Sequence, residues 1–176
     1  MNRKDTKESI ENLIQKIRKL NKFVAIRSTF MVGFPGEKRK HFKQLKQFIS
    51  EYKLNNVGFF DYSREEFTRS YKMKGQVHGF IKKLRLKEIQ KVQKQILLKN
   101  QQNFVGRTIA CVCDEKLDDN LYKFRSEYNS PDVDTYVYVY SQNELKVHEF
   151  YNIKITNVLN EDLQGEIVWI YQTEFH

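Results

Sequence analysis

Apolar residues recur at helical spacing near the start of the chain, which predicts an amphipathic helix after Asp5. The apolar stripe consists of Ile10, Leu13, Ile14, Ile17 and Leu20. Glu8 follows Asp5 by three residues, a spacing typical of a capping box in which Asp stands in place of Ser or Thr. We therefore expect Asp5 to cap this helix.

The next segments alternate between strand and helix patterns. Residues 23–32 are nearly continuously apolar and rich in β-branched and aromatic side chains, as in a strand buried on both faces. A Gly-Phe-Pro-Gly-Glu turn at 33–37 ends this strand. The helix predicted next places inward Phe42, Leu45, Phe48, Ile49 and Tyr52.

A second strand is predicted at 57–62, followed by a polar loop to about His78 and a long helix over about 79–102. The inward side of this helix is predicted to carry Leu84, Ile89, Val92, Ile96 and Leu97. Helices between strands imply parallel pairing. Because two parallel strands neither cover both faces nor close a barrel, we expect this part to be the tail of a longer protein.

After Val105 the pattern changes to short strands separated by turn residues. The predicted strands are 108–113, 121–127, 135–140, 151–158 and 166–171, an arrangement typical of a small β-barrel or sandwich. The fold class predicted is thus α/β followed by all-β. We place the domains at residues 1–102 and 103–176.

Charge divides at the same point. Residues 1–103 carry 25 Lys and Arg against 9 Asp and Glu, a formal +16, whereas residues 104–176 carry 6 against 13, a formal −7. The first part is expected to attract polyanions, and the second is expected to repel them and to favour a basic partner.

Composition restricts the other function classes. The two cysteines, Cys111 and Cys113, alternate on one side of a predicted strand and suit a protein core better than a disulfide or metal site. The four histidines are scattered, so no metal site is expected. Without an apolar run of about 20 residues or a secretory signal, we expect a cytoplasmic protein with no membrane partner.

Candidate chemistry lies at the turn after the first strand. A strand that runs into a glycine-bracketed turn and then a helix offers backbone N–H groups to an anionic or polar ligand, although an ordinary tight turn has the same residues. Arg27 lies in the apolar strand. There a cation requires a buried partner or a ligand, since an unpaired buried charge costs several kcal/mol.

The run from Arg27 to Glu37 resembles a signature of the methylthiotransferase branch of the radical S-adenosylmethionine enzymes. Residues 1–3, 57–63, Glu65-Glu66 and the segment 103–108 are similar to further family segments, the last being the entry to a TRAM domain. Residues 125–134, with 150–156 and 162–166, resemble the RimO-type enzymes rather than the tRNA-modifying relatives. The resemblance implies a partial TIM-like radical-enzyme barrel followed by a five-stranded, OB-like TRAM barrel.

The resemblance also implies an activity and sites. RimO-type enzymes add a methylthio group to the β-carbon of an aspartate in a small-subunit ribosomal protein. The implied S-adenosylmethionine site comprises Arg27, Ser28, Gly33, Phe34, Gly36, Glu37 and, at the adenine, Phe60. The implied contacts to the basic ribosomal protein are Arg125, Asp132 and Asp134. In a full-length version, changing both aspartates to asparagine is predicted to abolish substrate binding but not cofactor cleavage.

Some family features are absent from this sequence. The radical chemistry requires a Cys-x-x-x-Cys-x-x-Cys loop and a second iron–sulfur cluster, and neither set of ligands is present. Lys38 stands where Thr is usual, and residues 67–69 replace the usual Gly-Thr-Pro. We therefore interpret the chain as a fragment that is inactive alone, with the clusters belonging to the full-length protein.

Two alternatives remain open. A tRNA methylthiotransferase fragment would use the basic half as its RNA surface, with the cations of one helix, Lys82, Lys83, Arg85, Lys87, Lys91 and Lys94. A non-enzymatic adaptor would instead use the β-barrel to bind ribosomal protein or ribosomal RNA.

Overall fold

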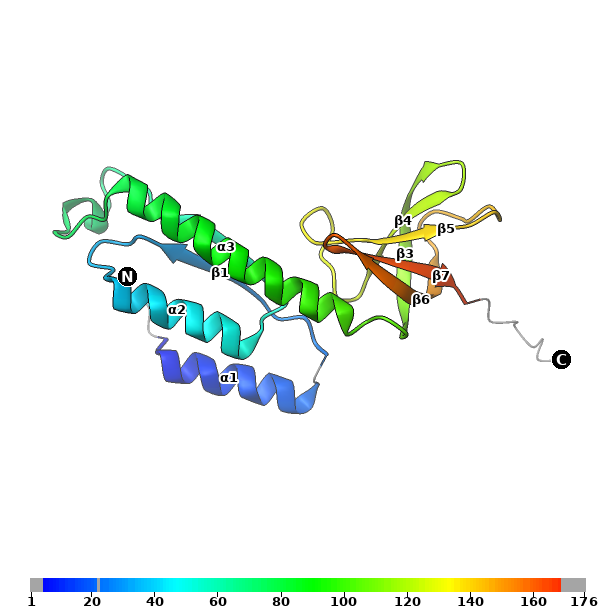
Figure 1. Ribbon diagram of the computed structural model, residues 1–176, viewed down its shortest axis with the longest axis horizontal. Coiled ribbons are helices and arrows are strands. Elements are labelled where there is room, and N and C mark those ends of the chain that lie inside the picture. Colours follow the sequence, from blue (N-terminus) through cyan, green and yellow to red (C-terminus); the bar gives the residue numbers. More distant parts are fainter. Residues whose placement is uncertain (1–4, 22, 169–176) are drawn as a thin grey trace. The chain divides into compact units, whose positions relative to one another are not determined.

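The computed structural model describes residues 5–21 and 23–168 and divides the chain into two compact units, Met1–Ile96 and Leu97–His176. Figure 1 shows a helix-rich amino-terminal unit and a carboxyl-terminal unit made of strands. The division falls within the long helix α3 (Gly79–Gln102). The predicted order, an α/β region followed by a five-stranded β-barrel, is confirmed.

The amino-terminal unit is built on two parallel strands. These are β1 (Arg27–Val32) and β2 (Asn56–Asp61), paired from Arg27 with Asn56 to Val32 with Asp61. Helix α1 (Lys7–Leu20) precedes β1, and α2 (Arg39–Tyr52) connects the two strands. A short 3₁₀ helix, η1 (Arg69–Lys72), lies in the connection from β2 to α3.

One face of this sheet is covered by helices. Phe30 and Val32 of β1 and Phe59 of β2 pack against a core to which α1, α2 and α3 contribute Ile14, Phe42, Phe48, Ile49, Ile89 and Ile96. The opposite face is not covered by the described residues: Thr29 and Gly58 are exposed there. The prediction of a strand buried on both faces is therefore wrong. The strand also begins at Arg27 rather than at residue 23.

Two details of the helices differ from the sequence prediction. The cap of α1 is Thr6, not Asp5: its hydroxyl accepts from the Ser9 N–H at 3.1 Å, and the Ser9 hydroxyl accepts from the Thr6 N–H at 3.0 Å. Ser9 thus takes the position that a capping box usually gives to Glu or Gln. Leu84 of α3 is 53% exposed rather than inward.

The carboxyl-terminal unit is a closed barrel with strand order β3-β4-β5-β7-β6. Its strands are β3 (Thr108–Asp118), β4 (Leu121–Ser126), β5 (Val137–Tyr140), β6 (Phe150–Leu159) and β7 (Asp162–Ile167). Neighbouring strands are antiparallel except β5 and β7, which are parallel. Each of these strands pairs with two neighbours, which closes the sheet into a barrel.

Buried and more exposed side chains alternate along much of the barrel strands, and register shifts in β3 and β6 interrupt this alternation. The interior holds Ile109, Cys111, Cys113, Tyr122, Phe124, Val137, Val139, Ile153, Ile155 and Leu163. Burial raises the pKa of the Cys111 thiol to about 12 and also raises the pKa of Cys113. Both thiols are free and behave as core hydrophobes.

A buried polar network fixes the segment between β4 and β5. The Gln101 side-chain amide donates to the Thr135 hydroxyl at 2.7 Å and to the Glu161 carbonyl at 3.0 Å. Asn129 donates to the same hydroxyl at 3.2 Å and accepts from the Ser126 hydroxyl. Because Gln101 is 5% exposed, these bonds satisfy groups that water does not reach.

Candidate functional site

The turn after β1 is closed by hydrogen bonds within itself and with the loop after β2. Gly33 and Gly36 adopt positive φ values of 76° and 84°, a conformation that favours glycine. The Glu37 N–H donates to the Phe34 carbonyl at 2.9 Å. The Gly36 N–H donates to the Gly75 carbonyl at 2.8 Å, which joins the two loops at the carboxyl ends of the strands.

Glu37 and two cations of α3 complete this arrangement. One Glu37 carboxylate oxygen accepts from the Gly33 N–H at 2.8 Å, and the other lies 2.6 Å from Arg85 Nη1. Lys82 donates to the Tyr62 carbonyl at 2.5 Å, and its Nζ lies 5.6 Å from the centre of the Tyr62 ring. The sequence predicts that Arg85 and Lys82 lie on a basic helix, but it does not indicate these partners.

The backbone N–H groups of the turn, which an anion could bind, already donate hydrogen bonds within the protein. The N–H groups of Gly33, Gly36 and Glu37 all have protein acceptors, and the Lys38 N–H donates to His41 Nδ1 at 3.2 Å. These four donors are therefore not available to an anion. The expectation that this turn offers its backbone N–H groups to a ligand is wrong for these positions.

The predicted cofactor residues divide into two groups. Gly33, Phe34, Gly36 and Glu37 form the turn, and Phe60 lies near it because it pairs with Met31 just before β1 ends. Phe60 is 45% exposed on the uncovered face.

Arg27 and Ser28 lie at the other end of β1, five or six residues from Gly33, which is about 17–20 Å at ~3.3 Å per residue. Ser28 shares the helix-covered face with Phe30, whereas Arg27 lies on the uncovered face and is exposed. Arg27 therefore does not carry the burial cost inferred from its apolar neighbours.

The Tyr62 hydroxyl is a buried polar atom that has no hydrogen-bond partner among the described residues. Tyr62 follows β2 directly, is 5% exposed, and packs its ring edge-on against Phe34 with the centroids 5.3 Å apart. An unsatisfied buried hydroxyl costs about 1–3 kcal/mol. A hydrogen-bonding group added beside this turn would remove that cost.

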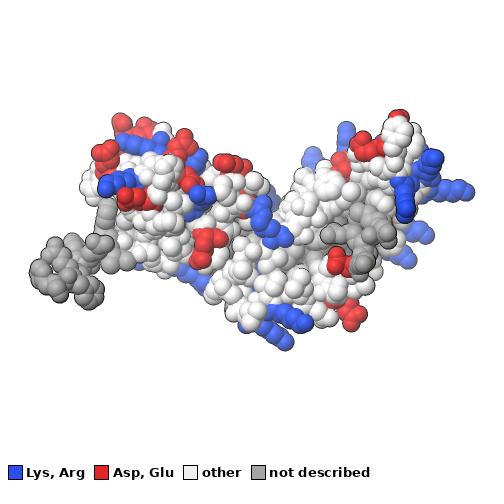
Figure 2. All heavy atoms as spheres, turned by 180° about the vertical axis from the view of Figure 1, so that it is seen from behind, with Lys and Arg blue, Asp and Glu red and all other residues white. Residues whose placement is uncertain are grey.

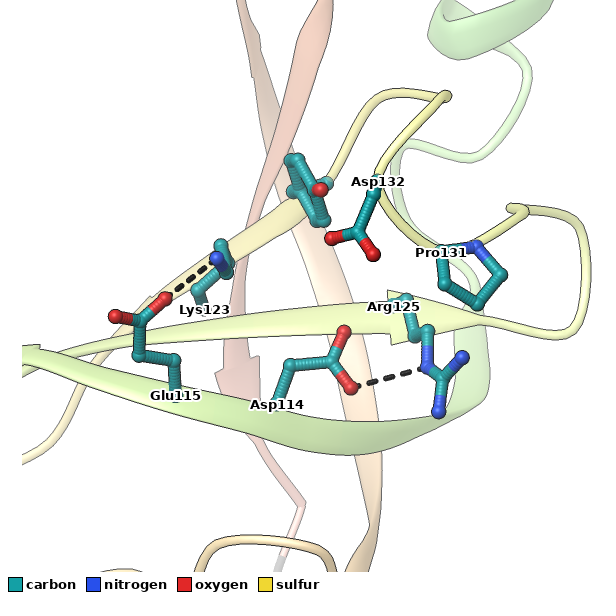
Figure 3. A pocket seen from close by; sticks show the side chains of 7 residues that line it. Asp114, Glu115, Lys123, Arg125, Pro131 and Asp132 are labelled. Atoms are coloured by element: carbon teal, nitrogen blue, oxygen red, sulfur yellow. Dashed lines mark hydrogen bonds and ion pairs between the residues drawn. The ribbon is translucent and has the colours of Figure 1, made fainter.

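The barrel carries a polar pocket of about 340 Å³ lined by Asp114, Glu115, Lys123, Arg125, Pro131, Asp132 and Tyr136. Figure 3 shows Asp114 facing Arg125 and Glu115 facing Lys123, with Asp132 on the opposite side of the pocket. Lys123 Nζ lies 2.6 Å from Glu115, and this hydrogen bond raises the pKa of Lys123. Arg125 Nε lies 3.0 Å from Asp114, an ion-pair distance without hydrogen-bond alignment.

The pocket brings together two of the three predicted docking residues. Arg125 and Asp132 line it, and Asp132 is exposed, with a φ of 57° that directs the backbone through a tight turn. Asp134 instead accepts from the Ser130 N–H at 2.7 Å, which closes the loop. The two cations are matched by Asp114 and Glu115, so Asp132 contributes the excess negative charge.

Charge is interleaved over the barrel rather than gathered in one acidic face. Figure 2 shows Asp and Glu alternating with Lys and Arg over this unit, whereas Lys and Arg project from the rim of the amino-terminal unit. Among the described residues of the barrel, Asp114, Glu115 and Glu149 each lie within 4 Å of a cation. The excess of acids over cations nevertheless leaves the unit negative.

The described residues hold neither a candidate metal site nor a candidate membrane span. Among residues 5–21 and 23–168, no three His, Cys, Asp or Glu side chains lie close enough together to hold a metal ion. In the same part of the chain, no helix has both the length and the apolar character needed to span a membrane.

Comparison with known proteins identifies relatives of both units. Residues 105–168 match the TRAM domain family. Proteins named "Ribosomal protein uS12 methylthiotransferase RimO" are similar over nearly the whole chain. Those of Thermoanaerobacter sp. (strain X514) and Desulforamulus reducens are 41% and 39% identical over 94% and 95% of this chain, and that of Clostridium kluyveri is 40% identical over 95%.

The chain spans less than two-fifths of these relatives: 38% of the first two and 37% of the third. The similarity nevertheless crosses from the α/β region into the barrel. Over nearly its whole length the chain is thus homologous to part of the RimO methylthiotransferases, and it carries a TRAM domain at residues 105–168.

Proposed function

We propose that this chain is part of a ribosomal-protein methylthiotransferase, an enzyme that adds a methylthio group to the β-carbon of an aspartate in a small-subunit ribosomal protein. The observation that carries the proposal is the similarity to RimO proteins, which runs through both units at about 40% identity. In this proposal, residues 1–102 are part of a TIM-like radical-enzyme barrel, and residues 103–176 bind the substrate.

The cofactor side is proposed to be the carboxyl end of the sheet. Phe60, exposed on the uncovered face, offers an aromatic surface to an adenine, and Gly33, Phe34 and Gly36 border it through the turn. The unpartnered Tyr62 hydroxyl fits the arrival of a polar ligand there. Arg27, on the uncovered face, is proposed to contact the cofactor only at the far end of β1, whereas Ser28 faces the helices and lies outside that contact, and Glu37 acts within the turn.

Iron–sulfur clusters do not fit the cysteines of this chain. Cys111 and Cys113 are its only cysteines, and both are buried in the barrel core with raised thiol pKa values. Cluster ligation requires several accessible thiolates. We therefore expect the chain alone to be inactive, and its proposed contributions are binding contributions.

The proposed substrate surface is the pocket around Asp132. Its excess carboxylate suits a Lys or Arg side chain of a basic protein, and Arg125 holds one wall through Asp114. Asp134 is proposed to support this surface through the Ser130 turn. A tRNA would instead meet the net negative charge of the barrel, which opposes phosphate binding.

The test is binding of this chain to a uS12-type ribosomal protein and, separately, to tRNA. Asp132→Asn should weaken binding to the ribosomal protein about threefold or more at low salt. The matched control is Asp119→Asn, which removes an exposed carboxylate from the turn between β3 and β4, outside the pocket. Equal losses in both variants, or tight salt-dependent binding to tRNA alone, would refute the proposed substrate class.

A further inference from the structure

Arg85 holds the Gly33–Glu37 turn from a distant part of the chain. Its Nη1 donates to Glu37 Oε1 at 2.6 Å and to the Glu37 carbonyl oxygen at 3.1 Å. The second carboxylate oxygen of Glu37 accepts from the Gly33 N–H at 2.8 Å. Both side chains of the pair are only 12% exposed, so water screens this interaction weakly.

The packing around the pair is tight on the side of α3. A Cβ on Gly33 would lie 2.3 Å from Lys82 Cγ. The Lys82 side chain of α3 therefore packs directly against the backbone of the turn at Gly33, where a larger residue would clash. The Arg85 guanidinium lies 5.7 Å from the centre of the Phe42 ring, which supports its plane from α2. The arrangement leaves the Glu37 carboxylate enclosed by protein donors on both oxygens.

We propose that Arg85 is a positioning residue for this turn and that Glu37 acts through it rather than as a direct cofactor ligand. Arg85 orients the Glu37 carboxylate, and the carboxylate fixes the Gly33 N–H and so the path of the backbone beside Phe60. The part concerning the cofactor rests on the proposed function. The part concerning the turn rests only on the contacts described above.

The first experiment measures hydrogen exchange of the Gly33 amide by NMR in the full chain. Arg85→Met should accelerate this exchange about tenfold, because the hydrogen bond to a fixed charged acceptor is lost. The control is Lys46→Met, which removes a more exposed ion pair, Lys46 with Glu88, also anchored on α3. Unchanged Gly33 exchange in Arg85→Met would overturn the proposal. If Arg85→Met does not fold, Arg85→Lys is used in its place, and it should accelerate exchange of the Gly33 amide by an intermediate factor.

The second experiment is a double-mutant cycle on S-adenosylmethionine affinity, measured by calorimetry. If Glu37 acts only with Arg85, then Arg85→Met, Glu37→Gln and the double variant should each lose affinity by a similar factor, within about twofold. A Glu37→Gln loss that persists in full on the Arg85→Met background would make Glu37 a direct ligand and overturn the proposal. Absence of binding by the unmodified chain would count against the proposed function, and Gly33 exchange would still decide the role of Arg85.

Discussion

Replacing Gly165 by alanine should destabilise the barrel more than the same replacement at Gly106, the other glycine of this unit. Gly165 lies on β7 between β5 and β6, paired with Val139 and Ile155. Its Cβ would lie 2.5 Å from Ile153 Cγ2 and 2.8 Å from the Lys154 carbonyl oxygen. Normal contacts between carbon atoms are about 3.5–4.0 Å, so these neighbours must move by about 1 Å.

The structure offers little room for that movement. Ile153 is fully buried, and the Lys154 backbone belongs to the β6–β7 ladder. Overpacking of this kind costs about 1–3 kcal/mol, and a weakened ladder hydrogen bond adds about 1 kcal/mol. We therefore expect Gly165→Ala to lower the free energy of unfolding of the barrel by about 2–4 kcal/mol, or the urea midpoint by roughly 2 M at a slope of ~1.5 kcal/mol/M.

The assay is urea unfolding followed by circular dichroism, with amide exchange of barrel residues to separate the two units. Gly106→Ala is the matched control, because its added Cβ has no atom within 4 Å but its φ of +85° is unfavourable for alanine. That variant should cost only about 1 kcal/mol. A Gly165→Ala barrel that is as stable as Gly106→Ala would show that the close contacts relax freely, and the reasoning would fail.

Three further outcomes are expected. Gln101→Ala should cost about 1–3 kcal/mol in urea unfolding of the barrel, because it removes the donor to the Thr135 hydroxyl and the Glu161 carbonyl. Cys111 should resist alkylation at pH 8 until the barrel unfolds. Since its pKa rises from 9.0 unfolded to about 12 folded, it should also reduce stability as pH rises above 9, by up to about 1.4 kcal/mol per pH unit, an effect that should be smaller in Cys111→Val, which retains Cys113. Tyr62→Phe should leave thermal stability unchanged or raised, because the hydroxyl it removes has no partner; a clear loss of stability would contradict this.

Elements with strong local periodicity could be predicted closely from the sequence. The helix expected over about 79–102 is α3, Gly79–Gln102, because its inward positions Ile89 and Ile96 are apolar at helical spacing. Residues 23–26 misled the strand prediction because they are apolar without pairing as a strand. The Asn55 side chain instead accepts from the Ile26 N–H at 3.1 Å, in place of a neighbouring strand.

The last strand shows a second limit. It was predicted at 166–171 from its apolar residues, but β7 is Asp162–Ile167, and residues 169–171 lie outside the described part of the chain. Its inward positions are Leu163 and Gly165, and glycine gives no hydrophobic signal.

The candidate site was predictable only in part, because its key contacts join distant residues. The turn at 33–37 carries a local signature, but Arg85 reaches Glu37 across 48 residues, and Gln101 reaches Glu161 across 60. A run of lysines and arginines on a helix gives no indication of which members are enclosed. Arg85 is buried against Glu37 because of the way α3 packs on the turn, and a local sequence pattern does not predict that packing.

The uncovered face of β1 and β2 changes in character along its length. It begins with the charged and polar pair Arg27 and Asn56, passes the small pair Thr29 and Gly58, and ends with Met31 and Phe60. A molecule or chain resting on it would approach the backbone most closely at Gly58 and meet bulk and apolar surface near the turn. This change from polar to apolar residues favours one orientation of a bound ligand. A ligand with one charged end and one flat, apolar end would place its charged end near Arg27 and its apolar end near Phe60 before any specific hydrogen bond formed.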